Sequence, residues 1–192
     1  MLFENHRKTI LSVRGSMHPT EVELLYSLAS QVTEGCILEV GSWRGRSSTA
    51  MGLAVLDAGF DIKVYAVDPH EPFTGIYGGE FGANDRGHFY KNMLRTGCFK
   101  AVRLVNLSSE IIAPGWKDPI SLLFIDGDHS YEGVKRDADC WLPHLTKGGI
   151  AVFDDATDPE VGPYQLMQEL QRSGDYEHQE TVGKVVVLKK KR

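Results

Sequence analysis

The stretch ILEVGSWRGRSST, residues 37–49, carries the clearest signal of the fold. Its first residues complete an apolar run, Cys36–Val40, that is typical of a strand buried on both faces. Gly41 permits a tight turn directly after that strand, and Gly45 permits close backbone approach where the next helix begins. The stretch therefore predicts a strand, a glycine turn and a helix in succession.

Strand-like and helix-like segments alternate along the rest of the chain. We expect strands at residues 36–40, 62–67, 101–105, 121–125, 149–153, 176–181 and 184–189. We expect helices at residues 21–31, 47–58, 88–96, 131–145 and 161–172, with Thr20 capping the first. This alternation predicts a doubly wound α/β fold, Rossmann-like, with a mostly parallel sheet covered on both faces. A turn at Val182-Gly183 adds a C-terminal antiparallel hairpin.

Length and composition limit the possible classes of protein. The 192 residues suit one domain, with an N-terminal helical segment over residues 1–34 and a glycine-rich loop insertion over residues 70–90. A net charge of −5 argues against nucleic acid, and the basic run Lys189–Arg192 is read as a solvated terminus. No apolar run approaches the roughly 20 residues that cross a bilayer.

The expected location is the cytoplasm. The N-terminal residues are too polar for a secretory signal, and the three cysteines include no CxxC pair, which fits a reducing compartment. Residues 1–18 could pack on another subunit, so a homo-oligomer stays open.

Asp68 supplies a second acidic group near the glycine turn. It follows the strand at residues 62–67, 29 positions after Glu39 (68 − 39). Ligands of doubly wound sheets bind beyond the carboxyl ends of the strands, near the point where strand order reverses. A carboxylate at this position can accept both hydroxyls of a ribose, so we expect a nucleoside there.

Two classes of nucleotide compete for this turn. A dinucleotide site would need Gly-x-Gly-x-x-Gly, whereas Trp43 stands where the middle glycine would be. Glu39 adds a negative charge that disfavours a pyrophosphate but can hold a cationic amino-acid group through ordered water. S-adenosylmethionine (SAM) carries an ammonium and a sulfonium and no phosphate, so the residues favour SAM over NAD.

Carboxylates end two further strands. Asp126 follows the strand at residues 121–125, and Asp154 and Asp155 follow the strand at residues 149–153. The carboxyl ends of adjacent parallel strands meet, and three carboxylates brought together without a cation would repel one another. A hard divalent ion such as Mg²⁺ resolves that conflict. Alternatively, an aspartate caps a turn, as Asp128 can, or Asp126 holds the amino group of methionine.

His129 lies three residues after Asp126 and is the candidate general base. Its near-neutral pKa suits removal of a proton from a substrate hydroxyl. A lone histidine is more often structural, but this one stands beside the carboxylates. Of the other histidines, His70 has the next claim because it opens the long loop.

Three stretches of the chain resemble a known family. ILEVGSWRGRSST (37–49), VYAVDPH (64–70) and LLFIDGDHSYEGVKRDADCWLPHLTKGGIAVFDD (122–155) look like class I methyltransferases of the macrocin-type O-methyltransferase and cephalosporin-hydroxylase-related group, and more distantly like catechol O-methyltransferase. The resemblance implies a seven-stranded sheet, SAM as methyl donor, and methylation of a hydroxyl on a small molecule of sugar or natural-product type.

The resemblance also carries over site residues. It implies metal ligands at Asp126, Asp154 and Asp155, and it places His129 where the catechol enzymes have a catalytic lysine. Many relatives end the fifth strand in His-Asp, so Asp154-Asp155 is a departure that favours a hard metal. Taken with the turn, the implied donor-binding residues are Glu39, Gly41, Ser42, Trp43, Gly45, Ser47, Asp68, Pro69, Ser108, Asp126 and His129.

The loop at residues 70–90 has aromatic side chains that could stack on an acceptor or pack on the protein itself. They are Phe73, Tyr77, Phe81 and Tyr90.

Two other functions stay open. A nicotinamide-dependent oxidoreductase would share the fold, but the full glycine pattern is missing. A non-catalytic SAM-binding protein would have no use for a base beside a metal.

Overall fold

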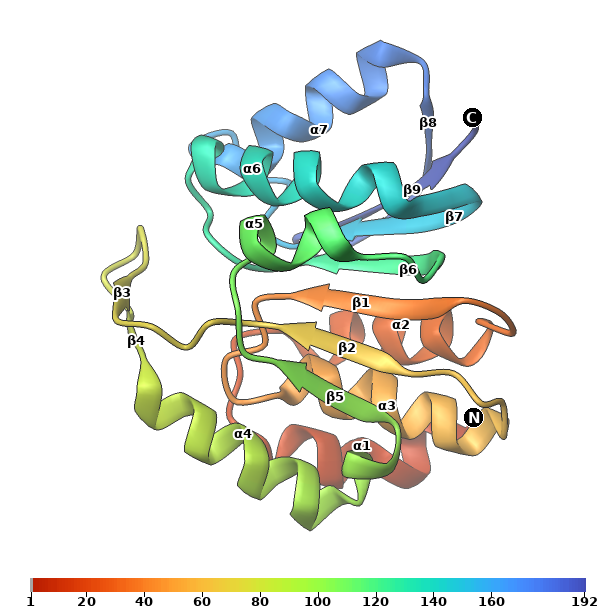
Figure 1. Cartoon of the computed structure of the whole chain (residues 1–192), viewed down its shortest axis with the longest axis vertical. Coiled ribbons are helices and arrows are strands. Elements are labelled where there is room, and N and C mark those ends of the chain that lie inside the picture. The colour runs from red at the N-terminus through yellow and green to blue at the C-terminus, as the bar shows by residue number, and fades with distance from the viewer. Residues whose placement is uncertain (1) are drawn as a thin grey trace.

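The computed structural model describes residues 2–192 as a sheet between two layers of helices (Figure 1). The strands are β1 (Cys36–Val40), β2 (Val64–Val67), β5 (Val102–Val105), β6 (Ile120–Ile125), β7 (Leu145–Phe153), β8 (Tyr176–Val182) and β9 (Val185–Lys190). Their order in the sheet is β5-β2-β1-β6-β7-β9-β8. Neighbouring strands from β5 to β7 are parallel, and β9 is antiparallel to β7 and β8. The predicted fold class is therefore confirmed.

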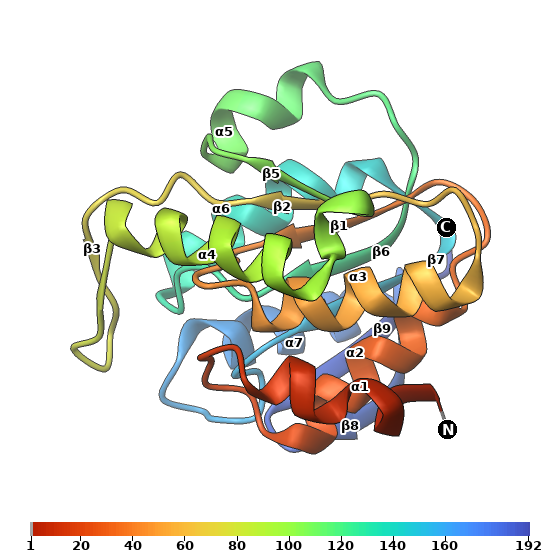
Figure 2. The same ribbon diagram turned by 90° about the horizontal axis from the view of Figure 1, so that it is seen from below.

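Helices cover both faces of the sheet (Figure 2). They are α1 (Leu2–Leu11), α2 (Pro19–Ser30), α3 (Arg46–Ala58), α4 (Ala83–Thr96), α5 (Ser109–Ile112), α6 (Tyr131–Trp141) and α7 (Gly162–Ser173). One apolar cluster joins α1 to α4 to one face, and a second joins α5 to α7 to the other. Each face is apolar because parallel strands must bury both of their sides.

Several predicted boundaries were wrong at the ends of elements. The first predicted helix is capped by His18 rather than Thr20, with Pro19 in its first turn and Glu21 completing a capping box. The helix predicted to reach residue 145 ends at Trp141 and continues as a 3-10 turn (Leu142–His144) that contains a proline. The helix α5 was not predicted, and α1 lies within the N-terminal segment that was predicted as helical without limits for this helix.

The long loop is more ordered than its glycines suggested. Residues 73–81 form a short antiparallel hairpin of β3 (Phe73–Thr74) and β4 (Glu80–Phe81). Helix α4 then begins at Ala83, five residues before the predicted start (88 − 83). The carboxylate of Asp85 accepts a hydrogen bond from the N–H of Gly82 and so stabilises this earlier start.

The reversal of strand order determines where a ligand can bind. The chain passes from β1 to β2 and β5 on one side, then returns to β6 on the other side of β1. The crossover connections leave a crevice beyond the carboxyl ends of β1 and β6. The β3–β4 hairpin projects from this end of the sheet (Figure 1).

Candidate active site

A cavity of about 500 Å³ lies at the carboxyl ends of the central strands. Its wall is formed by residues 14–17, 40–43, 46–47, 67–73, 81–82, 85, 108–110, 126–128 and 136–137. Four of these segments, 40–43, 67–73, 108–110 and 126–128, follow β1, β2, β5 and β6, so the cavity lies at the reversal of strand order. Eight of the residues predicted for the donor site line it: Gly41, Ser42, Trp43, Ser47, Asp68, Pro69, Ser108 and Asp126.

The turn after β1 is held by two contacts. Gly41 has φ +81°, and a Cβ atom there would lie 2.1 Å from the carbonyl oxygen of Asp126, so only glycine fits. The carboxylate of Asp68 accepts hydrogen bonds from the backbone N–H groups of Ser42 and Trp43, both at 2.9 Å, and from that of His70 at 2.8 Å. Asp68 therefore fixes the turn and also presents its carboxylate at the cavity wall.

Three residues predicted for the donor site do not line the cavity: His129 lies in an acidic cluster described below, and Glu39 and Gly45 lie behind this wall. Glu39 is fully buried, and the hydroxyls of Ser47 and Ser48 donate hydrogen bonds to its carboxylate. Burial raises the pKa of Glu39 to about 8, against the hydrogen bonds from the two serines, which lower it. Gly45 caps α3, and a Cβ atom there would lie 2.9 Å from Cε of Met93. In this structure both residues support the first turn of α3 and do not line the cavity.

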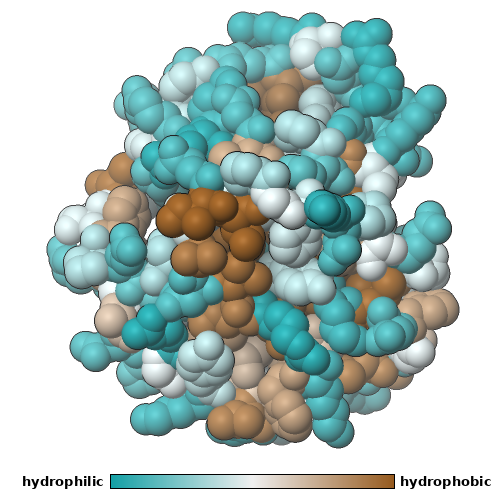
Figure 3. Space-filling view, viewed as in Figure 1, coloured by the Kyte–Doolittle hydropathy of each residue, from teal (hydrophilic) through white to brown (hydrophobic). Residues whose placement is uncertain are grey.

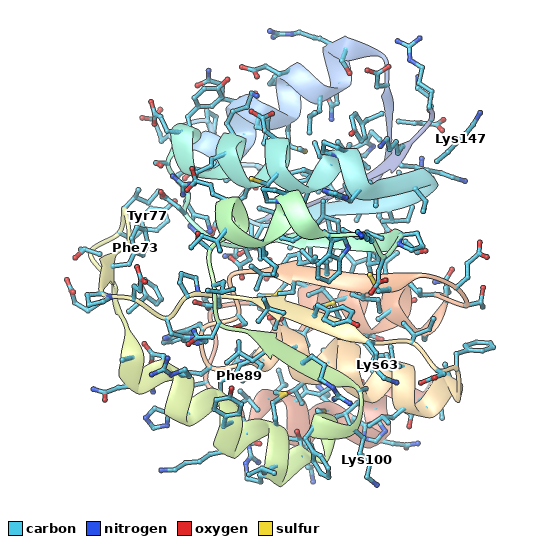
Figure 4. All side chains as sticks on the ribbon, viewed as in Figure 1. Lys63, Phe73, Tyr77, Phe89, Lys100 and Lys147 are labelled. Carbon is cyan, nitrogen blue, oxygen red and sulfur yellow. The ribbon has the colours of Figure 1, made fainter. Side chains whose placement is uncertain are left out.

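Aromatic side chains form one side of the cavity mouth. The ring of Phe81 lies 5.7 Å from that of Trp43 and 6.0 Å from that of Phe73, so the β3–β4 hairpin packs onto the turn after β1. The guanidinium groups of Arg14 and Arg44 lie 5.5 Å and 5.2 Å from the indole of Trp43. Figure 4 shows Phe73 and Tyr77 together on the projecting hairpin. Tyr90, by contrast, lies on α4 against Phe89.

Backbone strain is concentrated at this site. Within residues 2–192, the non-glycine residues with positive φ are Trp43, His70 and Asp155. Trp43 and His70 line the cavity, and their Nε1 and Nδ1 atoms are buried and have no hydrogen-bond partner among residues 2–192. Strained residues persist where the surrounding structure holds them, often at functional sites.

An acidic cluster lies at the ends of β6 and β7. Asp126, His129, Asp154 and Asp155 each offer one ligand atom, and these atoms lie within 4.8 Å of one another. His129 Nε2 lies 3.2 Å from Asp126 Oδ1, and His129 Nδ1 lies 3.5 Å from Asp155 Oδ2. The structure thus brings together the three carboxylates and the histidine that the sequence singled out. Asp126 belongs to both the cluster and the cavity wall.

Lys184 is a member of this cluster that the sequence analysis missed. Its Nζ atom lies 2.7 Å from Asp154 Oδ2 and 3.0 Å from Asp155 Oδ2. It follows the Val182-Gly183 turn, which the sequence identified only as a hairpin. No local pattern marks it, because the turn reaches the cluster only through the pairing of β9 with β7.

The charges of the cluster shift one another's pKa values. Burial and the nearby charge of Asp126 raise the pKa of Asp154, although Lys184 opposes the shift. Burial lowers the pKa of Lys184, but Asp154 and Asp155 more than offset this, so the pKa of Lys184 is raised and its ammonium stays charged. Burial also lowers the pKa of His129, but the hydrogen bond and charge of Asp126 raise it overall.

The N-terminal segment also contributes to the cavity, which the sequence analysis did not predict. Residues 14–17 line it between α1 and α2. The guanidinium of Arg46 donates hydrogen bonds to the carbonyl oxygens of Val13 at 2.7 Å and Met17 at 3.1 Å. The first turn of α3 therefore holds this segment against the cavity.

An apolar surface adjoins the cavity wall. Leu107 and Ile111 are 40% and 64% exposed and flank the wall residues 108–110. Figure 3 shows an apolar patch in the area of α5. None of the helices found in residues 2–192 is long and apolar enough to cross a membrane.

A family comparison agrees with this geometry. Residues 38–156, more than half of the chain, match a protein family described as "Methyltransferase domain". The chain belongs to this family. It is a SAM-dependent methyltransferase, and the family membership decides against the nicotinamide-dependent oxidoreductase. The matched residues run from β1 to just beyond Asp155 and so include the glycine turn and the carboxylates.

Solved structures share the fold at low sequence identity. An O-methyltransferase from Bacillus cereus in complex with SAH has a TM-score of 0.71 and 16% identity, covering 97% of this chain and 91% of that chain. TomG from Streptomyces achromogenes, an O-methyltransferase of tomaymycin synthesis solved with SAM, has a TM-score of 0.68 and 16% identity, covering 92% and 82%. CalS11, a TDP-rhamnose 3'-O-methyltransferase of calicheamicin biosynthesis, has a TM-score of 0.66 and 17% identity, covering 88% and 77%. At these identities the likeness establishes the fold.

A curated relative matches a short region of the chain. An uncharacterized protein, R132 of Acanthamoeba polyphaga mimivirus, is 46% identical over 48 residues. The match spans 23% of this chain and 22% of that relative's length. It carries no information about activity.

Proposed function

We propose that the protein transfers the methyl group of SAM to a hydroxyl on a small molecule. The observation that carries this proposal is the position of Asp126, which lines the cavity and also pairs with His129 in the acidic cluster. A donor in the cavity and a hydroxyl at the cluster would therefore lie side by side. Bringing the two reactants together in this way supplies much of the catalysis of a transfer reaction.

The cavity suits SAM in its size and in the chemistry of its wall. Its volume of about 500 Å³ lies in the range of small-molecule sites. Asp68 would accept a ribose hydroxyl at Oδ1, which has one backbone contact where Oδ2 has two, and Asp126 would accept from the amino group. Ser108, Pro69 and the turn at Gly41 would complete the wall around the adenosine. When bound, SAM supplies a methyl group on a cationic sulfur.

His129 is proposed as the general base. Asp126 on Nε2 and Asp155 near Nδ1 would orient its ring and stabilise the imidazolium that forms when the neutral histidine takes the hydroxyl proton as the acceptor attacks. We also propose Asp126, Asp154 and Asp155 as ligands of Mg²⁺. Oxygen donors suit this ion, and Asp154 Oδ1 is buried without a hydrogen-bond partner among the described residues. A bound ion would position and acidify the hydroxyl.

The acceptor is proposed to be a small hydroxylated compound of sugar or natural-product type, as in the macrocin-type group. TomG and CalS11, which share the fold, act in the synthesis of natural products. Phe73 and Phe81 at the cavity mouth provide a surface on which a ring can stack. We further propose that the chain acts as one methyltransferase domain in the cytoplasm, without nucleic acid.

A non-catalytic SAM-binding protein is the second candidate. It would need the cavity but not the histidine beside the carboxylates, so catalysis is favoured. The test starts with calorimetric titration of the protein with SAM, with and without Mg²⁺, and with NAD as the control. We expect micromolar binding of SAM and no signal with NAD. Binding of NAD without SAM would sink the proposal.

Methyl transfer from labelled SAM to a panel of hydroxylated compounds then separates enzyme from binding protein. His129→Gln should lower turnover at least about a hundredfold, the usual contribution of a general base, and leave SAM affinity within about threefold. Turnover near the wild-type rate would remove His129 as the base.

A further inference from the structure

The acidic cluster already contains a cation from the protein itself. Lys184 Nζ contacts one oxygen of Asp154 and one oxygen of Asp155, at 2.7 Å and 3.0 Å. Both carboxylates are proposed ligands of the divalent ion. An ammonium group and a metal ion repel each other and compete for the two oxygens that the ammonium contacts, Oδ2 of Asp154 and Oδ2 of Asp155.

The position of Lys184 is set by contacts on both sides of its backbone. Its N–H donates a hydrogen bond to Oε1 of Glu21 on α2 at 3.1 Å. Its carbonyl oxygen accepts one from the N–H of Ala156 at 2.9 Å. Ala156 directly follows Asp155, so this contact ties the hairpin turn to the carboxylates. The lysine is thus directed at the cluster by the fold, unlike a surface lysine that finds a carboxylate by chance.

One ammonium does not satisfy the whole cluster. Asp154 is 1% exposed, and only its Oδ2 atom contacts Lys184. Its Oδ1 atom is buried and has no partner among residues 2–192. Three carboxylates outnumber the one ammonium, and this leaves an attraction for a divalent ion.

We infer that Lys184 is the resident cation of the cluster, and that a divalent ion which uses Oδ2 of Asp154 and Asp155 must displace the Lys184 ammonium from them. Lys184 therefore determines how tightly this chain holds its metal. It also maintains the arrangement of the carboxylates when no metal is bound. This inference rests on the metal site of the proposed function.

The test measures binding of Mn²⁺ alone to the full chain, by electron paramagnetic resonance of the free ion, with no SAM or acceptor. Lys184→Gln should bind Mn²⁺ at least tenfold more tightly than the wild type. Lys184→Arg keeps a cation and should show no such gain. The matched control is Lys147→Gln. It removes the same charge from β7, at the end of the sheet opposite the β3–β4 hairpin (Figure 4).

Thermal unfolding tests the inference independently, in case Lys184→Gln folds less well than the wild type. In EDTA the Lys184→Gln variant should unfold at a lower temperature than the wild type, and Mn²⁺ should restore it. Adding Asp126→Asn to Lys184→Gln should abolish the gain in affinity, which assigns the ion to the cluster. Equal or weaker Mn²⁺ binding by Lys184→Gln than by the wild type overturns the inference but leaves the metal site standing. If neither protein binds Mn²⁺, both the inference and the proposed metal site are refuted. The SAM titration tests the proposed donor separately from this result.

Discussion

At the scale of single residues, burial changes the role of Glu39. The sequence placed its carboxylate at the cofactor, but the structure turns it toward Ser47 and Ser48, away from the cavity. A buried carboxyl group favours its neutral form because the charged form loses its hydration. Glu39 therefore shapes the site by holding the first turn of α3, from which Ser47 reaches the cavity wall.

The raised pKa of Glu39 predicts a dependence of stability on pH. The folded protein keeps the proton up to about pH 8, whereas an unfolded glutamate loses it near pH 4.3. The folded state thus binds more protons in this window, so the free energy of unfolding falls as pH rises through it. Glu39→Gln removes the titrating group.

Urea unfolding from about pH 5 to about pH 8 checks this prediction. Over that range Glu39→Gln should gain on the order of 3 kcal/mol relative to the wild type, since each pKa unit corresponds to about 1.4 kcal/mol. Parallel curves for the two proteins would contradict the assignment.

At the scale of elements, the turn after β1 depends on close contact with the end of β6. Gly41 lies directly against the carbonyl of Asp126, so any side chain would push the two strand ends apart. The cavity and the cluster share Asp126, and both therefore depend on this contact.

Substituting alanine for Gly41 and for Gly59 distinguishes the effect of this close contact from the effect of backbone strain. Gly41 and Gly59 have similar positive φ values, +81° and +73°, but a Cβ atom at Gly59 would have no atom of residues 2–192 within 4 Å. Gly59→Ala should therefore lower the free energy of unfolding by only about 1 kcal/mol, the strain of a left-handed residue. Gly41→Ala should lower it by more than about 3 kcal/mol, or prevent folding, because it adds a collision. Similar losses in urea unfolding of the two variants would show that strain alone requires Gly41.

At the scale of the whole molecule, the sheet separates two apolar clusters. Leu122 and Leu123 are neighbours on β6, yet they belong to opposite clusters because successive side chains of a strand point to opposite faces. Trp116 and Trp141 lie on the Leu123 side. If the chain is one domain, both faces should unfold in a single transition.

Truncation of these two leucines tests that cooperativity. Leu122→Ala and Leu123→Ala should each lower the free energy of unfolding by about 2–5 kcal/mol. In a Trp43→Phe background, tryptophan fluorescence reports the Leu123 side and circular dichroism reports the whole chain. Each variant should shift both transitions equally. A fluorescence transition that Leu122→Ala leaves unmoved would mean that the two faces unfold separately.

The order of strands and helices followed from local patterns. The run Cys36–Val40 was predicted with its observed limits, because an apolar run before a glycine is readable without knowledge of its neighbours. Asp126, Asp154 and Asp155 could be grouped because the carboxyl ends of parallel strands meet at one edge of a sheet. These inferences need only the chain order and the geometry of a strand.

Only the tertiary structure decided which side chains face one another. Lys184 is 30 positions from Asp154 along the chain and 163 from Glu21, which fixes its backbone. The N-terminal segment reaches the cavity through Arg46, and Glu39 faces α3 and not the cavity. Sequence patterns determine which elements form, because periodicity and turn chemistry act over a few residues. Partners across the fold depend on how the elements pack, and that is set by the whole chain at once.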